Sequence, residues 1–231
     1  MAERNNKDKV SNQISVFKNN KGVLETQNCL KPSPRLFPWH IHASGKEEGY
    51  SRIRLVALNY SEDQDEKAVS VYANLKPEEV KFLLMKLCFG FENVDFEQQK
   101  IFRTGRGEEG TVTILSIKRS EFEENGKRRN IPWSVEIHNG TGIVKKNRMG
   151  GQYCKAKSYE ETGRAKIFLD DLAFFELLSR TCVVISAFEH KHLYREREIR
   201  NFQNLFLMIK RELEEQFERA PYDQRRYKEA A

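Results

Sequence analysis

Tyrosines alternate with lysines between residues 152 and 159, a spacing suited to contact with a nucleic-acid strand. If Gln152–Tyr159 is a β-strand, then Tyr153, Lys155, Lys157 and Tyr159 share one face, because alternate side chains point to the same side. Bases can stack on the rings while the ammonium groups contact phosphates. The pattern therefore predicts single-strand binding. The alternative is an exposed strand face whose charges serve solubility and edge protection.

A second segment offers the same chemistry earlier in the chain. Residues 50–60 also alternate as a strand, and Tyr50, Arg52 and Arg54 fall on one side of it. The other side is apolar and consists of Ile53, Leu55 and Ala57. We expect the apolar side to enter the core and the basic, aromatic side to contact nucleic acid.

The net charge of +6 is modest, but the positive charge is concentrated in residues 127–157. That segment has one acid, Glu136, and its bases are Lys127, Arg128, Arg129, Lys145, Lys146, Arg148, Lys155 and Lys157. Such an excess attracts phosphate, unless acids from elsewhere in the fold pair with these side chains. The predicted nucleic-acid-binding residues are Tyr50, Arg52, Arg54, Lys145, Lys146, Arg148, Tyr153, Lys155, Lys157 and Tyr159.

Other chemistry is poorly supported, and we expect a non-enzymatic protein without a cofactor or metal. The glycines of Gly105–Gly110 match a dinucleotide-binding spacing, but a strand pattern follows them, so they favour a hairpin turn. Residues 139–142 are interpreted as another turn. His40 and His42 share a strand face without a further ligand at metal-binding spacing. No catalytic triad order or phosphate-binding loop is present, and the four cysteines lack paired spacing.

The elements that would position these residues follow one order twice. Residues 14–25 predict a hairpin, and further strands are expected at 38–43, 50–60 and 68–75, before a helix that starts near Pro77. Strands are then expected at 98–104, 111–119, 133–139, 152–159 and 164–169, before a helix from Asp170. Trp39 and Trp133 are expected in the core.

The two halves align at an offset of 94 residues, which favours an internal duplication. The offset relates Pro38-Trp39 to Pro132-Trp133. It also relates Leu75, Val80, Leu83 and Leu84 to Leu169, Phe174, Leu177 and Leu178.

This order, four strands and a helix in tandem, resembles the Whirly-type single-stranded-DNA-binding proteins and the related positive-cofactor-four class. The resemblance covers roughly residues 13–190 and rests on element order and repeat register. Whirly proteins carry a Lys-Gly-Lys-Ala-Ala-Leu strand motif, from which the nearest segment, Gly163–Leu169, departs, so no residue is carried over. The resemblance implies antiparallel sheets with exposed faces, central helices, and single-strand binding with little sequence preference.

We therefore predict an α+β fold with two tandem strand-rich ββββα repeats, antiparallel sheets, central helices and a long C-terminal helix. The predicted parts are a disordered tail at 1–12, repeats at 13–97 and 98–188, the C-terminal helix at 189–219, and a loose tail at 220–231. That helix carries an apolar stripe of Ile199, Phe202, Leu205, Phe206, Ile209, Leu213 and Phe217.

The expected partner is single-stranded DNA, bound in replication, recombination or transfer, with RNA as the alternative. The apolar stripe predicts packing within the chain or a homo-oligomer formed through helices. A protein–protein adaptor that uses this helix is the second alternative. The polar first residues and short apolar runs favour a cytoplasmic protein without membrane contact.

Overall fold

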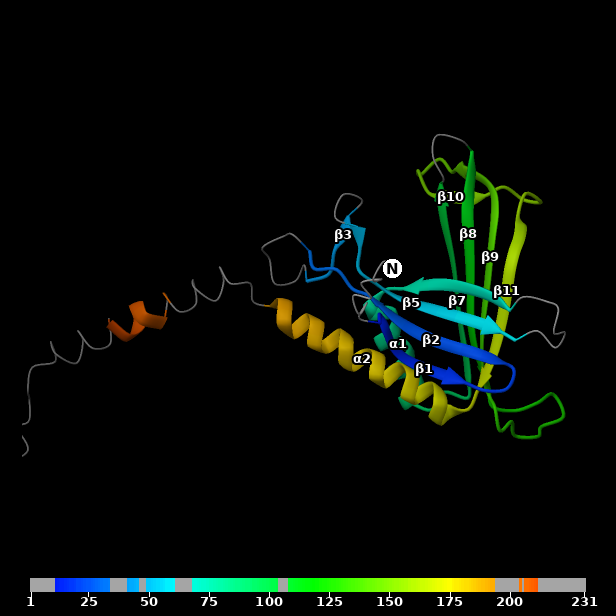
Figure 1. Ribbon diagram of the computed structural model, residues 1–231, viewed down its shortest axis with the longest axis horizontal. Coiled ribbons are helices and arrows are strands. Elements are labelled where there is room, and N and C mark those ends of the chain that lie inside the picture. The colour runs from blue at the N-terminus through cyan, green and yellow to red at the C-terminus, as the bar shows by residue number, and fades with distance from the viewer. Residues whose placement is uncertain are drawn as a thin grey trace, which may run out of the picture.

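The fold is α+β, and its main described elements are two antiparallel sheets, a two-stranded ribbon and the helices α1 and α2 (Figure 1). The computed structural model describes residues 11–33, 41–45, 49–60, 68–103, 108–193, 204 and 206–211. The first sheet has the order β1-β2-β5-β6, and the second has β7-β8-β9, with β10 and β11 pairing with different parts of β9.

The first sheet is a meander that leads into a helix. Its strands are β1 (Gln13–Lys18), β2 (Gly22–Cys29), β5 (Arg52–Asn59) and β6 (Val69–Leu75). A two-stranded ribbon lies between β2 and β5 in the chain and consists of β3 (Ser44–Gly45) and β4 (Gly49–Tyr50). Helix α1 (Pro77–Cys88) follows β6.

The second sheet is built from longer strands and also leads into a helix. Its strands are β7 (Asn93–Arg103), β8 (Glu109–Ser120), β9 (Trp133–Lys146), β10 (Gln152–Cys154) and β11 (Glu160–Leu169). Helix α2 (Asp171–Leu193) follows β11. Figure 1 shows the strands of the two sheets running nearly crosswise, with α2 lying along β1.

Local sequence signals explain why these elements start where they do. The predicted hairpin is confirmed: in the turn between β1 and β2, Asn19 Oδ1 accepts from the amides of Lys21 and Gly22 at 2.9 and 3.0 Å. At the start of α1, Glu79 accepts from the amide of Lys76 at 2.7 Å. At the start of α2, Asp170 accepts from the amide of Ala173 at 2.7 Å.

The core lies between the crossed sheets and the helices. The predicted inward side of β5, consisting of Ile53, Leu55 and Ala57, is buried, and Trp133 is fully buried, as expected. The helices pack on each other and contribute Val80, Leu83, Phe174, Leu177 and Leu178 to the same cluster. One face of the first sheet is thereby covered, and the other, which we call the open face, carries half-buried and exposed side chains.

A buried arginine ties the second sheet to the start of α2. Arg119, with 8% of its side chain exposed, binds both carboxylate oxygens of Asp171 at 3.1 and 3.2 Å. It also contacts Glu121 at 3.0 Å and donates to the backbone oxygens of Phe91 and Glu92. Trp133 Nε1 donates to Asp171 at 2.7 Å. Hydrogen bonds from Arg119 lower the pKa of Asp171 against the opposing effect of burial.

Several sequence predictions were wrong in their details. The strand expected at 152–159 ends at Cys154, because the chain turns there: Ser158 N donates to Lys155 O at 3.1 Å, and Lys157 has φ +62°. Residues 139–142, expected as a turn, lie inside β9. β7 starts at Asn93 rather than Gln98.

Other predictions fall outside the described residues. These include Trp39, His40, residues 1–10, most of the helix predicted at 189–219, and the whole tail at 220–231. Residues 204 and 206–211 are helical, and Phe206, Leu207, Met208 and Ile209 are exposed. Within the described part of the chain, no helix is both long and apolar enough to cross a membrane.

Candidate nucleic-acid interface

The open face of the first sheet meets the second sheet at an inside corner that carries arginines and aromatic rings. Cross-strand partners share a side, so Arg54 of β5 lies on the same side as Asn74 of β6, and Val56 on the same side as Tyr72. This side is opposite the buried Ile53 and Leu55. We call Tyr50, Arg52, Arg54, Tyr72 and Phe102 the corner surface.

Each arginine of the corner surface lies over an aromatic ring. The guanidinium carbon of Arg52 is 4.9 Å from the ring centre of Tyr50 and 5.3 Å from that of Phe102 on β7. That of Arg54 is 4.8 Å from the ring centre of Tyr72. Cation–π contact at these distances orients the guanidinium groups. All three rings remain between 42% and 48% exposed, so they offer surface to a ligand.

The backbone beneath Tyr72 is held by a side chain of the second sheet. Asn139 of β9 accepts from the amide of Tyr72 and donates to its carbonyl, both at 2.9 Å, much as a neighbouring strand would. Lys100 of β7 binds the carbonyl of Asn74 and lies 4.0 Å from Glu79. Burial lowers the pKa of Lys100, and nearby Arg52 adds to this effect. Side chains of the second sheet thus fix the backbone of β6 at the corner, which is locally positive.

The corner arginines differ from the cations on the opposite face of the second sheet. In the described part of the chain, Arg52 and Arg54 form no ion pair, and the buried Nε of Arg54 has no hydrogen-bond partner. On the opposite face, Glu136 binds Arg164 and Lys166, while Lys118 binds Glu97 at 2.8 Å. The corner therefore has positive charge available for a phosphate, whereas the opposite face is largely neutralised.

The other predicted binding residues gather at the far end of β9. Tyr153 of β10 pairs with Lys145, and Gln152 with Lys146, while Arg148 lies in the connecting turn. Lys145 is joined to Glu108 by a 2.5 Å ion pair, and Tyr153 is 48% exposed. By strand alternation, Lys145 and Thr141 lie on the same side of the sheet. Thr141 pairs with Thr111 of β8, and Thr111 pairs with Phe102 of β7, so Phe102 lies on that side as well. This cluster and the corner surface thus share one side of the second sheet.

The shared face predicted for Tyr153, Lys155, Lys157 and Tyr159 does not form, because the strand ends at Cys154. Tyr159 instead packs over β9, where a Cβ on Gly140 would lie 2.5 Å from its ring. Burial raises the pKa of Tyr159. Its ring therefore packs against the strand, while Lys155 and Lys157 are exposed in the turn.

The basic segment 127–157 is also divided. Arg128 and Arg129 lie in the connection before Trp133, at one end of β9, and Lys145 and Lys146 are at the other. A strand of this length separates its ends by roughly 40 Å at about 3.3 Å per residue. Arg128 pairs with Glu121 at 3.0 Å. Only the second group can belong to the cluster near Tyr153.

A serine, a histidine and a glutamate form a chain of contacts that sequence reasoning missed. His42 Nδ1 is 2.9 Å from Ser51 Oγ, and His42 Nε2 is 3.0 Å from Glu189 on α2. Serine hydrolases use the same three groups, but with the serine at Nε2 and the acid at Nδ1. Ser51 is also only 5% exposed, and its oxygen accepts from the amide of Lys31 at 3.0 Å. The arrangement fits a structural clip between α2 and the residues that flank the ribbon, rather than a nucleophile.

We expect this clip to lose strength in acid. Burial opposes ionisation of Glu189, but hydrogen bonds from Lys81 and His42 outweigh it, so the pKa lies below its ordinary value. A carboxylate with a lowered folded pKa stabilises above its unfolded pKa, about 4.3, and loses this contribution as pH falls through the folded value. Glu189→Gln should therefore lower the free energy of unfolding by about 1.5–3 kcal/mol at pH 7. The difference from the parent should shrink in urea melts below about pH 4; a constant difference at every pH would contradict this assignment.

Tyr72, Phe102, Lys100 and Asn139 were missed as site residues. Tyr72 could have been found, since it alternates with Val71 and Ala73 in a predicted strand. The others required knowledge of how the two sheets cross.

Among the described residues, no group of three or more His, Cys, Asp or Glu side chains is placed to hold a metal ion. Comparison of the chain with protein-family models, curated proteins and solved structures gave no match.

Proposed function

We propose that the protein binds single-stranded nucleic acid without strong sequence preference, through the corner surface. The observation that carries the proposal is the pair of arginines, Arg52 and Arg54, held over exposed rings without an acidic partner in the described residues. Guanidinium groups bind phosphates, and exposed rings stack on unpaired bases. Duplex DNA hides its base faces, so these rings favour a single strand.

The cluster around Tyr153 extends this proposed path. Lys145, Lys146, Arg148, Lys155 and Lys157 would hold the backbone of a strand that leaves the corner, with Tyr153 as a further stacking ring. Lys145 and Lys155 both lie close enough to Glu108 to lower its pKa. Tyr159, packed over Gly140, would position this cluster rather than stack on a base.

A duplicated architecture of the Whirly type belongs to the same proposal. At the offset of 94 residues, the starts of α1 at Pro77 and α2 at Asp171 coincide, and so do the last strand residues, Leu75 and Leu169. In this proposal β5 corresponds to β9, which differs from the sequence alignment. Ile53 of β5 pairs with Leu75 in the same way as Trp133 of β9 pairs with Leu169. Ile53, rather than Trp39, is therefore the counterpart of Trp133.

Self-association through helices is a further part of the proposal. α1 exposes Phe82 and Met85, and the segment that follows it exposes Phe89 and Phe91. Phe206 and Ile209 of the predicted C-terminal stripe are exposed as well. Exposed apolar side chains favour burial between subunits. Burial against a different protein would correspond to the adaptor alternative. Sedimentation over a range of concentrations tests the proposal, and a monomer at all concentrations would contradict it.

A competition experiment tests the binding proposal. A labelled mixed-sequence DNA strand is bound first and then displaced by unlabelled single-stranded DNA, duplex DNA of the same sequence, or RNA. We expect single-stranded DNA to displace the label at a lower concentration than duplex, because only unpaired bases can stack on the rings. More effective displacement by duplex would contradict the proposal, and more effective displacement by RNA would assign the same surface to RNA.

A further inference from the structure

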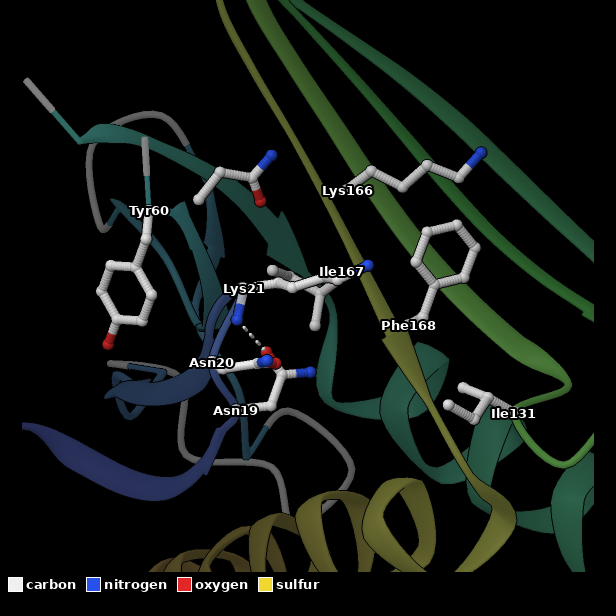
Figure 2. Close-up of a pocket in the computed structure, with 9 residues that line it drawn as sticks. Asn19, Asn20, Lys21, Tyr60, Ile131, Lys166, Ile167 and Phe168 are labelled. Atoms are coloured by element: carbon white, nitrogen blue, oxygen red, sulfur yellow. Dashed lines mark hydrogen bonds between the residues drawn. The ribbon is translucent and has the colours of Figure 1, made fainter. Parts of the chain in front are cut away.

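A pocket lies at the end of β5 opposite the corner surface. It has a volume of about 660 Å³, within the size range of small-molecule sites. Its walls come from the turn between β1 and β2, the end of β5, and β11. Figure 2 shows Tyr60 and Phe168 on opposite sides of this space, with Ile167 between them. The pocket therefore has apolar and aromatic walls.

A residue that lines this pocket, Asn59, has a buried polar atom without a partner. The side-chain oxygen of Asn59 is buried, and no hydrogen bond reaches it in the described part of the chain. The backbone of Asn59 is fixed by pairing with Gly22 on one side and Val69 on the other. A buried, unsatisfied acceptor is costly, so a ligand that donates a hydrogen bond there would be favoured.

A cation stands beside these groups. Lys21 lies in the turn that lines the pocket and forms no ion pair among the described residues. Lys166 also lines the pocket, but its ammonium group is 3.1 Å from Glu136. Lys21 is thus the group available for an anion. Lys18 lies 5.9 Å from the ring centre of Tyr60 and adds positive charge nearby.

We infer that this pocket binds an adenine nucleotide. The base lies against Tyr60 and Phe168, its amino group donates to Asn59, and its phosphate contacts Lys21. The amino group of adenine and the ring nitrogen beside it match the two ends of an asparagine amide. The site goes beyond the proposed strand binding and does not depend on it. The nucleotide can be free or part of a strand.

Calorimetric titration with AMP, IMP, adenosine and inorganic phosphate tests the site. IMP carries a carbonyl oxygen in place of the amino group, so it should bind at least about tenfold more weakly than AMP. Asn59→Leu should weaken AMP by about tenfold or more and remove the preference over IMP. Because this variant deletes an unpaired buried acceptor, its melting temperature should not fall. Lys21→Ala should weaken AMP and leave adenosine unchanged.

The double variant Arg52→Ala, Arg54→Ala separates this site from the corner surface and should bind AMP as the parent does. If AMP does not bind, a short adenine oligonucleotide should still bind to this double variant. Adding Asn59→Leu to the double variant should abolish that binding, which would assign the pocket to a base within a strand. Phosphate that binds as tightly as AMP, or equal binding of adenine ligands by the parent and Asn59→Leu, would overturn the inference.

Discussion

Replacing Arg119 by methionine is expected to lower the free energy of unfolding by about 1.5–3 kcal/mol, because a buried arginine loses its hydrogen bonds to charged groups while Asp171, 49% exposed, stays partly hydrated. The methionine can fill the volume of the arginine stem. It leaves Asp171 without its two-point partner, and it leaves the backbone oxygens of Phe91 and Glu92 without their donor. The start of α2 and the junction before β7 should both loosen. Urea denaturation followed by circular dichroism measures the change.

Arg128→Ala is the matched control for Arg119. Arg128 contacts the same glutamate, Glu121, but its side chain is 72% exposed. An exposed pair of this kind contributes at most about 1 kcal/mol. Equal losses for the two variants would show that the buried network does not anchor α2.

Removing both corner arginines should have the largest effect on binding. Arg52→Ala with Arg54→Ala should weaken a mixed-sequence DNA strand by roughly a hundredfold, since hydrogen bonds to charged groups contribute about 1.5–3 kcal/mol each. The slope of log affinity against log salt should become shallower by about 1.4, at about 0.7 per phosphate on a single strand. Fluorescence anisotropy over a salt series measures both quantities.

Two comparison variants make this result specific to the corner. Arg128→Ala with Arg180→Ala removes the same charge from exposed positions elsewhere and should change affinity only slightly. Arg52→Lys with Arg54→Lys keeps the charge, so the salt slope should be retained while the stacked geometry over Tyr50 and Tyr72 is lost. If the two alanine pairs weaken binding equally, net charge alone explains the affinity.

Much of the fold was predictable because its signals are local. The hairpin at β1 and β2 is set by Asn19 and Gly22, whose turn chemistry is visible in the sequence. The alternation of Ile53, Leu55 and Ala57 gave both the strand and its buried side. The helix starts at Pro77 and Asp171 follow from proline and acidic residues in the first turn.

The errors have a common physical origin in contacts between distant segments. Tyr153 to Tyr159 has the alternation of a strand, yet the chain turns after Cys154 and packs Tyr159 over Gly140. Gly140 and Gly142 favour a turn by local propensity. Inside β9 they instead leave room for the segment from Cys154 to Tyr159 to pack over the strand. A turn prediction there was reasonable from local propensity and was overridden by tertiary packing.

The sequence predicted the kinds of side chain at the candidate site, arginines beside aromatic rings, but not the full set of residues that form it. Tyr50, Arg52 and Arg54 were identified from one strand, and the structure brings them together with Tyr72 and Phe102 from two others. No pattern within a single strand shows that β6 lies against β9 through Asn139. The excess of positive charge at 127–157 suggested a single basic surface. It forms two separate groups instead, because β9 places the two halves of the segment at opposite ends of the strand.

The central claim is that a single strand lies on the corner surface. Ultraviolet crosslinking of a bound DNA strand, followed by mass spectrometry of the protein peptides, locates the contact directly. We expect crosslinks at Tyr50, Tyr72 and Phe102, with Tyr153 as a further site along the path, and their loss in the Arg52→Ala, Arg54→Ala variant. Crosslinks confined to the exposed Phe82 and Phe89 at α1, or unchanged by that double variant, would contradict it.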